Sequence, residues 1–293
     1  MLGRATLLGV CLLTTVLATG VGGCGRRLVA AAPGQRLVTL PGHATAAALP
    51  VTTLDLLVWN VHKTRASDWL DDFERLAAAA DLVLLQEAYD RPLLRAGIHT
   101  RPDMDWQLGV SFRYARRDHA ATGVATGSVA PARRSWVMYA PAREPWSGTP
   151  KLALVSTFPL HGRRDALLVI NVHAINFRRA KHLGDQLRQL SAAIDEHEGP
   201  VIMAGDFNTH HRPRLQVLER FASEHGLRAV LPNWGRGTRR RRPVADGRTR
   251  FGRWPLDHVY VRGLHATATR VSVDTEGSDH RPLEIQLELD PPT

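Results

Sequence analysis

The chain has 293 residues, 44% of them apolar, so it is long enough for one large domain or two smaller ones with a real hydrophobic core. Its cysteines, Cys11 and Cys24, both lie near the start, which excludes disulfide and thiol chemistry from the remaining sequence. The net charge of +10 is concentrated in two segments, because residues 1–50 hold four arginines and no acid, and residues 233–254 hold eight arginines and one aspartate.

The first 24 residues have the layout of an export signal. One early positive charge is followed by an apolar run of about a dozen residues and then by small residues. Thr14, Thr15 and Thr19 interrupt the run, which disfavours a membrane span of roughly 20 apolar residues. The ending VGGC also resembles a bacterial lipoprotein box, in which Cys24 receives lipid, and a chance match in an Ala/Gly-rich leader is the alternative. We expect an exported protein of the cell envelope or exterior, with membrane association through its N-terminus.

The next part of the chain divides into a linker and a domain. Residues 25–50 are rich in Ala, Gly, Pro and Thr without periodicity, which predicts a flexible tether. No later segment reads as a linker, so residues 51–293 are expected to form one domain.

From residue 54 onward, short apolar runs alternate with amphipathic stretches, which predicts a mixed α/β domain. Helices are expected over 68–79, over 181–197 and from Pro213 to about His225. The spacing of the strands is too close for a purely parallel sheet. Strands are expected over 54–60, 81–87, 106–112, 122–129, 134–140, 151–157, 166–174, 200–206, 256–261, 268–274 and 282–289.

Several apolar runs end in residues that strands seldom contain. LDLLVWN ends in Asn60, DLVLLQE in Gln86 and Glu87, LLVINVH in Asn171 and His173, and VIMAGDFN in Asp206 and Asn208. Near the C-terminus, Asp257 opens a strand, and Asp279 and His280 precede another.

Each of these signals has an ordinary explanation when it is taken singly. Asp-Phe-Asn after a strand is commonly a turn, a terminal Glu is commonly a solvated charge, and His173 could be a satisfied core histidine. Buried polar groups need partners, however, so we expect these strand ends to converge on a common cleft at one rim of a sheet.

In chain order, the stretches WN, LLQE, NVH, GDFN, LDHV and SDHRPL resemble the successive motifs of the endonuclease/exonuclease/phosphatase superfamily. This superfamily includes pancreatic-type deoxyribonucleases, apurinic endonucleases, neutral sphingomyelinases and inositol polyphosphate 5-phosphatases. The resemblance covers residues 54–289 and is closest to small bacterial members of poorly defined substrate. It implies a four-layer α/β/β/α sandwich, in which two mixed sheets pack face to face with helices outside and the active site lies at one rim.

Carboxylate and amide oxygens suit a hard cation such as Mg²⁺. Glu87 is the first candidate ligand, with Asn60 beside it and Asp279 assisting, and the resemblance implies the same assignment. The sequence has no cysteine cluster or closely spaced histidine pair of the structural zinc type, so Zn²⁺ is disfavoured and Mn²⁺ is expected to substitute for Mg²⁺. The number of metal ions stays open.

The resemblance also implies catalytic roles. Asp206 would orient or deprotonate the attacking water, and Asn208 would donate a hydrogen bond to the phosphoryl oxygens. His280 would contact the scissile phosphate as a proton donor or electrostatic stabiliser, with Asp257 accepting its other N–H.

The basic segment precedes the strand of Asp257, so we expect it beside the catalytic rim. A run of arginines is often only a solvated segment, but this position favours an anionic, extended substrate. The candidate phosphate contacts are Arg239, Arg240, Arg241 and Arg242, and Trp234, Phe251 and Trp254 could stack on bases or contact lipid.

Three functions stay open at this point. The first is a Mg²⁺-dependent phosphodiesterase acting on nucleic acid, favoured by the basic segment and by His173, which matches the second histidine of the deoxyribonuclease and sphingomyelinase branches, with Asn171 assisting by hydrogen bonding. The second is a hydrolase of phospholipid head groups or small phosphate monoesters, favoured by a membrane-anchored N-terminus. The third, a non-catalytic anion-binding module, is disfavoured because the polar set is intact.

Overall fold

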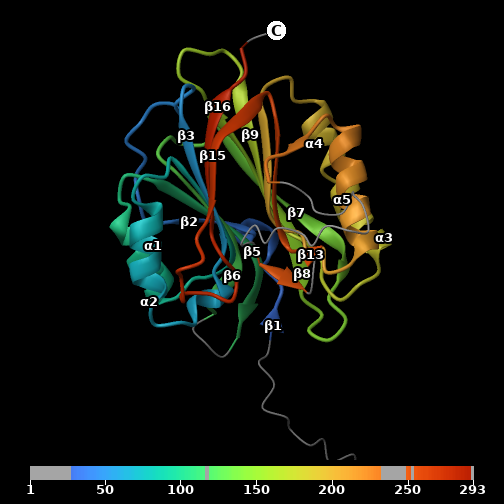
Figure 1. Ribbon diagram of the computed structural model, residues 1–293. Helices are drawn as coiled ribbons and strands as arrows, with labels where there is room; N and C mark the ends of the chain where they lie inside the picture. Colours follow the sequence, from blue (N-terminus) through green and yellow to red (C-terminus); the bar gives the residue numbers. More distant parts are fainter. Residues whose placement is uncertain (1–27, 116–118, 232–248, 252–253, 292–293) are drawn as a thin grey trace, which may run out of the picture.

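The computed structural model describes residues 28–115, 119–231, 249–251 and 254–291. Within these residues, two large β-sheets pack face to face, and helices cover both outer faces (Figure 1). This is the four-layer α/β/β/α sandwich that the sequence predicts, and the fold class is confirmed.

The first sheet holds eight strands of the described chain and is mixed, because β3 runs parallel to β4 while the other pairs are antiparallel. Its order is β1 (Leu28–Val29), β5 (Asp105–Tyr114), β6 (Ala121–Ser128), β4 (Leu82–Tyr89), β3 (Leu54–Asn60), β16 (Leu283–Leu289) and β15 (Leu264–Val271), and β2 (Leu37–Leu40) also pairs with β5.

The second sheet holds six described strands and is also mixed, with β9 parallel to β10. Its order is β11 (Arg228–Ala229), β14 (Asp257–Arg262), β10 (Val201–Asp206), β9 (Ala166–His173), β8 (Pro150–Pro159) and β7 (Arg134–Arg143). A short ribbon of β12 (Arg250–Phe251) and β13 (Trp254–Pro255) lies outside both sheets.

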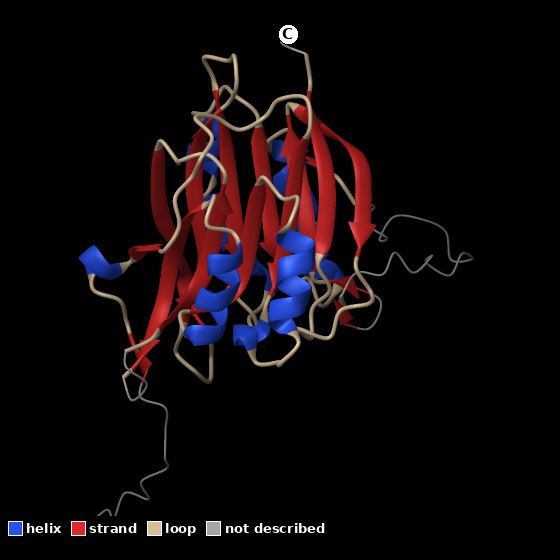
Figure 2. Ribbon diagram, turned by 90° about the vertical axis from the view of Figure 1, so that its left-hand side faces the viewer, coloured by secondary structure: helices blue, strands red, loops and turns tan. Residues whose placement is uncertain are grey.

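The helices divide between the two outer faces. α1 (Trp69–Ala77) and α2 (Pro92–Thr100) lie against the first sheet and stand in front of it in Figure 2. The second sheet is covered by α3 (Ala180–Arg188), α4 (Ser191–Asp195) and α5 (Arg212–Glu224). Two 3₁₀ turns, η1 (Pro33–Gln35) and η2 (His62–Thr64), complete the described elements. The longest of the described helices, α5, has 13 residues, and none of them has the length and apolar character of a membrane span.

Strand alternation builds three layers of core. Leu54, Leu56 and Val58 of β3 face the second sheet, and Leu57 and Trp59 face α1. On β10, Ile202 and Ala204 face the first sheet, and Val201 and Met203 face α3 and α5. Since both strands are apolar on both faces, they read as continuous apolar runs, as expected for central strands.

The predicted strands are all present within a few residues of their expected bounds, and three other features differ from the sequence prediction. The expected helix 181–197 is divided into α3 and α4 by a turn in which the Leu190 N–H donates to the Leu187 carbonyl at 2.8 Å. α2 was not predicted, because its nine residues include Pro92 and Gly97, which are typical of turns and loops.

The expected flexible tether is wrong for residues 28–50. β2 pairs with β5 from Leu37 to Leu40, and Leu40 and Leu49 are buried. The physical reason is that the first sheet has an open edge at β5, which this segment covers. The expected leader, residues 1–24 with Cys24, lies outside the described residues.

Candidate active site

The strand register places the polar strand ends at one rim of the sandwich. In the second sheet, Asp206 pairs with His173 of β9 on one side and with Asp257 of β14 on the other. In the first sheet, Asn60 at the end of β3 pairs with Gln86 of β4. β16 runs toward the C-terminus marked in Figure 1, and β3 is antiparallel to it, so the rim lies at the opposite end of the molecule.

Asp206 lies at the centre of this rim. Asn60 Nδ2 donates a hydrogen bond to Asp206 Oδ2 at 3.1 Å, which joins the two sheets. His173 Nε2 lies 3.6 Å and His280 Nε2 4.0 Å from the same oxygen. Asp206 is 2% exposed, so three side chains from three different segments surround its almost fully buried carboxylate.

His280 is held against two carboxylates. Its Nδ1 lies 3.0 Å from Asp257 Oδ2, and its Nε2 faces Asp206. Burial alone would lower the pKa of His280, but Asp257 and then Asp206 outweigh it and raise this pKa to about 10. The imidazole is therefore a cation at neutral pH, and Asp257 fixes its orientation.

Asp206 is almost fully buried, and its pKa therefore differs from that of an exposed aspartate. Burial raises its pKa to about 6, with Asp257 adding to the rise and His280 opposing it. A carboxyl group with this pKa is ionised at neutral pH and is basic enough to accept a proton from water during catalysis. The geometry thus places a base, Asp206, and a cation, His280, next to each other.

An irregularity of β4 determines the direction of the Glu87 side chain. Leu85 faces α1, so simple alternation would place Glu87 on the outer face as well. Instead, Glu87 has φ 54°, and the pairing of β4 with β6 shifts register between Gln86 and Ala88. This β-bulge turns the Glu87 carboxylate into a pocket between the sheets.

Two lysines surround the Glu87 carboxylate. Lys63 Nζ donates to Glu87 Oε2 at 2.6 Å. Lys151 Nζ lies 2.8 Å from His173 Nε2 and lines the same pocket. Burial alone would raise the pKa of Glu87, but Lys151, His173 and Lys63 outweigh it and hold this pKa well below its usual range.

His173 is neutral in these surroundings. Burial, followed by the positive charge of Lys151, lowers its pKa well below the usual value. The unprotonated Nε2 then accepts the hydrogen bond from Lys151 Nζ. The two histidines of the rim therefore differ in charge, since His280 is cationic and His173 is neutral.

Asn208 and Asn171 were predicted to act in catalysis, and the side-chain amides of both form hydrogen bonds within the protein. Asn208, with φ 51°, donates from Nδ2 to the Ala174 carbonyl at 3.0 Å, and its N–H bonds Asp206 Oδ1 at 2.8 Å. Asn171 is fully buried and donates from Nδ2 to the Ala125 carbonyl at 2.8 Å, while Gln86 Nε2 donates to its Oδ1 at 2.8 Å. Asn171 thus joins the two sheets beneath the site by hydrogen bonds.

The turn after β10 is anchored by a residue that the sequence did not single out. Arg214 of α5 is fully buried, and its Nε donates to the Asn208 carbonyl at 2.7 Å. Its two terminal nitrogens donate to the carbonyls of Phe207, Ile175 and Arg178. One guanidinium therefore holds the backbone of the segments that follow β9 and β10.

Comparison with known proteins agrees with this arrangement. The pattern of the Endonuclease/Exonuclease/phosphatase family matches residues 57–280. The "UPF0294 protein" of Klebsiella pneumoniae (strain 342) is 35% identical over 284 residues, which cover 89% of this chain and 95% of that protein. The chain belongs to this family. It is a metal-dependent hydrolase of phosphoric esters, as members of the family are.

Solved structures of other proteins share the fold. The mannosyl-6-phosphatase Bt3783 of Bacteroides thetaiotaomicron superposes with a TM-score of 0.59 at 17% identity, over 80% of this chain and 99% of that chain. TDP2 of D. rerio, solved in complex with a single-strand DNA product, superposes with a TM-score of 0.55 at 16% identity, over 80% and 99% of the two chains.

The three predicted metal ligands each have a different partner atom in the structure. Glu87 contacts Lys63, Asn60 Oδ1 accepts the His62 N–H at 3.1 Å, and the Asp279 side chain is 60% exposed and lies 3.4 Å from His62 Nδ1. Of the three, Glu87 fits a divalent cation best, because its half-buried, ionised carboxylate already holds a cationic ammonium group.

In the described part of the chain, a different trio has potential ligand atoms within 4.8 Å of one another, namely Asp206, Asp257 and His280. These three are joined through the protonated His280, so they form a hydrogen-bonded ion network. A cation bound there would have to displace a proton from His280, which makes Glu87 the better anchor for the metal.

Lys63, Lys151 and Arg214 are the site residues that sequence reasoning missed. Lys63 lies three residues after Asn60, so its motif WNVHKTR was the available signal. Lys151 is recognisable only from the pairing of β8 with β9, which sets its neighbour Leu152 opposite His173. The predicted contacts Arg239 to Arg242 lie outside the described residues.

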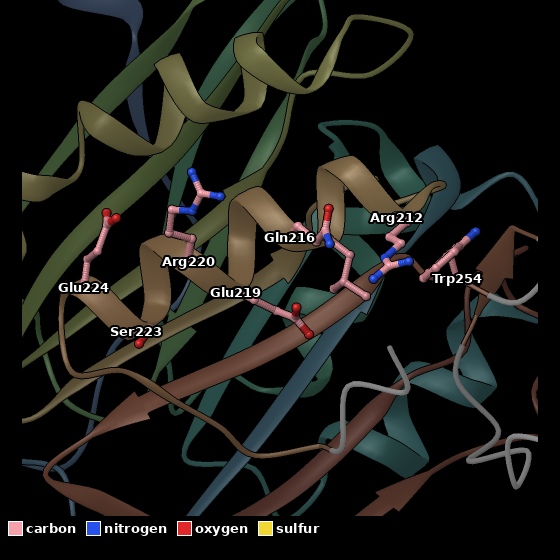
Figure 3. Close-up of a pocket in the computed structure, with 8 residues that line it drawn as sticks. Arg212, Gln216, Glu219, Arg220, Ser223, Glu224 and Trp254 are labelled. Atoms are coloured by element: carbon pink, nitrogen blue, oxygen red, sulfur yellow. The ribbon is translucent and has the colours of Figure 1, made fainter. Parts of the chain in front are cut away.

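A larger cavity of about 470 Å³ lies along the exposed side of α5, away from this pocket (Figure 3). Its lining combines the cations Arg212 and Arg220 with the carboxylates Glu219 and Glu224, and Trp254 closes one end. Since the cavity shares no lining residue with the pocket of Glu87, we assign the chemistry to the rim and not to this groove.

Proposed function

We propose that this protein is a Mg²⁺-dependent phosphodiesterase that hydrolyses nucleic acid by in-line attack of water. The observation that carries the proposal is the buried Asp206 held next to the cationic His280–Asp257 pair. In-line displacement at phosphorus requires a base for the water and positive charge on the non-bridging oxygens, and these two groups supply both.

In this proposal, Asp206 orients the attacking water and accepts its proton. His280 donates a hydrogen bond to a non-bridging oxygen, while Asp257 keeps its ring charged and aimed. His173 and Lys151 stabilise the same developing negative charge from the β8–β9 side. Mg²⁺, held by Glu87 with Asn60 beside it, would supply additional charge neutralisation, and Mn²⁺ would substitute.

Nucleic acid is favoured over other phosphoesters by two observations. The basic segment 233–254 leads directly into β14, which carries Asp257. In addition, a structural neighbour, TDP2 of D. rerio, was solved with a single-strand DNA product. The alternative is a hydrolase of phospholipid head groups or small monoesters, which the similarity to a mannosyl-6-phosphatase supports.

A substrate panel distinguishes these functions. The purified full-length chain is offered plasmid DNA, RNA, sphingomyelin, a sugar phosphate and bis-p-nitrophenyl phosphate, with Mg²⁺ or with EDTA. We expect metal-dependent cleavage of DNA or RNA at a higher kcat/KM than for the other esters. Turnover confined to sphingomyelin or to the sugar phosphate would contradict the proposal and favour the alternative.

We also propose that the protein is exported, on the basis of the layout of residues 1–24. Mass spectrometry of the mature N-terminus in cell fractions tests this proposal. Cleavage before Cys24 with a lipid adduct, or cleavage without one, would support export in its two forms, and an intact Met1 in the cytosolic fraction would contradict it.

A further inference from the structure

A second, larger groove opens next to the catalytic pocket. It has a volume of about 540 Å³ and is lined by residues of η2, α2 and the ends of β4 and β5. Lys63 lines both this groove and the pocket of Glu87, so the two are neighbours. The pocket itself measures only about 30 Å³, room for about two water molecules, so the bulk of any substrate must lie outside it.

The groove is lined by cationic side chains. Lys63, Arg65 and Arg91 contribute three of them, Lys63 also pairs with Glu87 of the neighbouring pocket, and the described lining includes no carboxylate. It also includes the start of α2, whose first turn has no acidic residue and whose N-terminus has no side-chain cap. Cationic side chains and a helix N-terminus together favour an anion.

The backbone that forms this groove is strained. His62, Lys63 and Thr64 have φ values of 43°, 60° and 49°, and three successive non-glycine residues rarely adopt this left-handed region. Each costs on the order of 1 to 3 kcal/mol, and such strain collects at binding and catalytic sites. The turn is held by the Thr64 N–H bond to the Val61 carbonyl at 2.7 Å and by the Lys63–Glu87 ion pair.

Two tyrosines, Tyr89 and Tyr114, belong to the lining of the groove. The rings of Tyr89 and Tyr114 meet edge to face with centroids 5.1 Å apart, and the Arg91 guanidinium lies 5.9 Å from the Tyr89 centroid. Tyr89 is 7% exposed, and its hydroxyl has no hydrogen-bond partner in the described part of the structure. A buried hydroxyl without a partner costs free energy, so Tyr89 is a lining residue of the groove whose hydrogen-bonding capacity is unused in the described structure.

We propose that this groove is a second phosphate subsite, which binds the phosphate next to the scissile one in a single nucleic-acid strand. Arg65, Arg91 and the N-terminus of α2 contact its oxygens, and the lining residues Tyr89 and Tyr114 contact the attached sugar. The proposal rests on the proposed function, because it assumes that a nucleic-acid strand enters the pocket of Glu87. A monoester of a simple sugar would leave the groove empty.

Binding, measured separately from cleavage, tests the subsite. Fluorescence anisotropy gives the Kd of labelled oligothymidylate for the full-length chain with Asp206→Asn, without metal, at several salt concentrations. We expect Arg65→Ala combined with Arg91→Ala to weaken binding about tenfold or more. The slope of log affinity against log salt should become shallower by about 0.7 for each phosphate of the single strand that the variant no longer neutralises. Arg188→Ala is the matched control, because Arg188 is an exposed arginine of α3.

If the double variant keeps the Kd and salt slope of the Arg188→Ala control, the subsite is wrong. If the double variant instead loses binding to anionic phospholipid vesicles while oligothymidylate binding is unchanged, the groove recognises lipid and the proposal is overturned. Cleavage assays report on the proposed function alone: a chain that binds DNA through Arg65 and Arg91 without cutting it would keep the subsite and lose the nuclease activity.

Discussion

Glu87 shows most clearly where residue-level reasoning succeeds and where it stops. The motif LLQE identifies Glu87 as a candidate, because a carboxylate at the end of an apolar strand needs a partner. Its direction could not be predicted, since alternation from Leu85 places it on the outer face. Only the bulge, in which Glu87 has φ 54°, turns its side chain inward. Because non-glycine residues seldom adopt this left-handed conformation, the sequence does not predict it.

His280 provides the first prediction. In the metal-free protein, its ring should remain protonated up to about pH 10, because Asp257 and Asp206 both stabilise the cation. Asp257 raises the pKa of His280 more than Asp206 does, so Asp257→Asn should lower this pKa. NMR titration of the histidine ring signals measures both values. A wild-type His280 that loses its proton near the usual histidine pKa of about 6.5 would refute the proposed ion network.

Arg214 provides the second prediction. Arg214→Leu should lower the free energy of unfolding by about 3 kcal/mol, because several buried carbonyls lose their donor at a cost of roughly 1 to 3 kcal/mol each. Urea denaturation measures the change. Arg220→Leu, at an exposed arginine of the same helix, is the control and should change stability by less than about 0.5 kcal/mol. Equal effects of the two substitutions would show that Arg214 does not anchor the turn.

At the scale of elements, the strands were predictable and their partners were not. Apolar runs bounded by turn residues identify the central strands, whereas a strand's neighbours depend on contacts between distant segments. The meeting of Asp206 with His173 and Asp257 is a property of that pairing. The same limit explains the missed β2, whose short alternating segment becomes a strand only against the edge of β5.

Gly205, near the end of β10, packs closely against Val172 of β9 and provides the third prediction. It has φ +135°, and a Cβ there would lie 2.1 Å from the Val172 carbonyl oxygen. Gly205→Ala should therefore destabilise the protein by more than about 2 kcal/mol. Gly184→Ala in α3 is the control, because its Cβ would make only ordinary contacts and the helix should gain up to about 1 kcal/mol. Thermal or urea unfolding compares them, and a Gly205→Ala protein as stable as wild type would contradict this backbone geometry.

At the scale of the whole molecule, the sandwich explains why the site is where it is. The inward face of each central strand is apolar along its length and becomes polar at the rim, as in the series Ile202, Ala204, Asp206. The apolar part holds the two sheets together, and the polar part must find partners from the opposite sheet. Asn60 and Asp206 are such a pair. The resemblance of the motifs predicted this rim, but it could not supply the lysines that balance Glu87.

The central claim is that Asp206 is the base of a metal-dependent hydrolytic centre, and the most direct measurement is the kcat of Asp206→Asn on bis-p-nitrophenyl phosphate with saturating Mg²⁺. Asparagine keeps the shape of the side chain and removes its basicity. We predict a loss of at least a hundredfold, within the range of general base catalysis, with an unchanged far-UV circular dichroism spectrum and with wild-type activity abolished by EDTA. An Asp206→Asn protein with wild-type kcat would contradict the account.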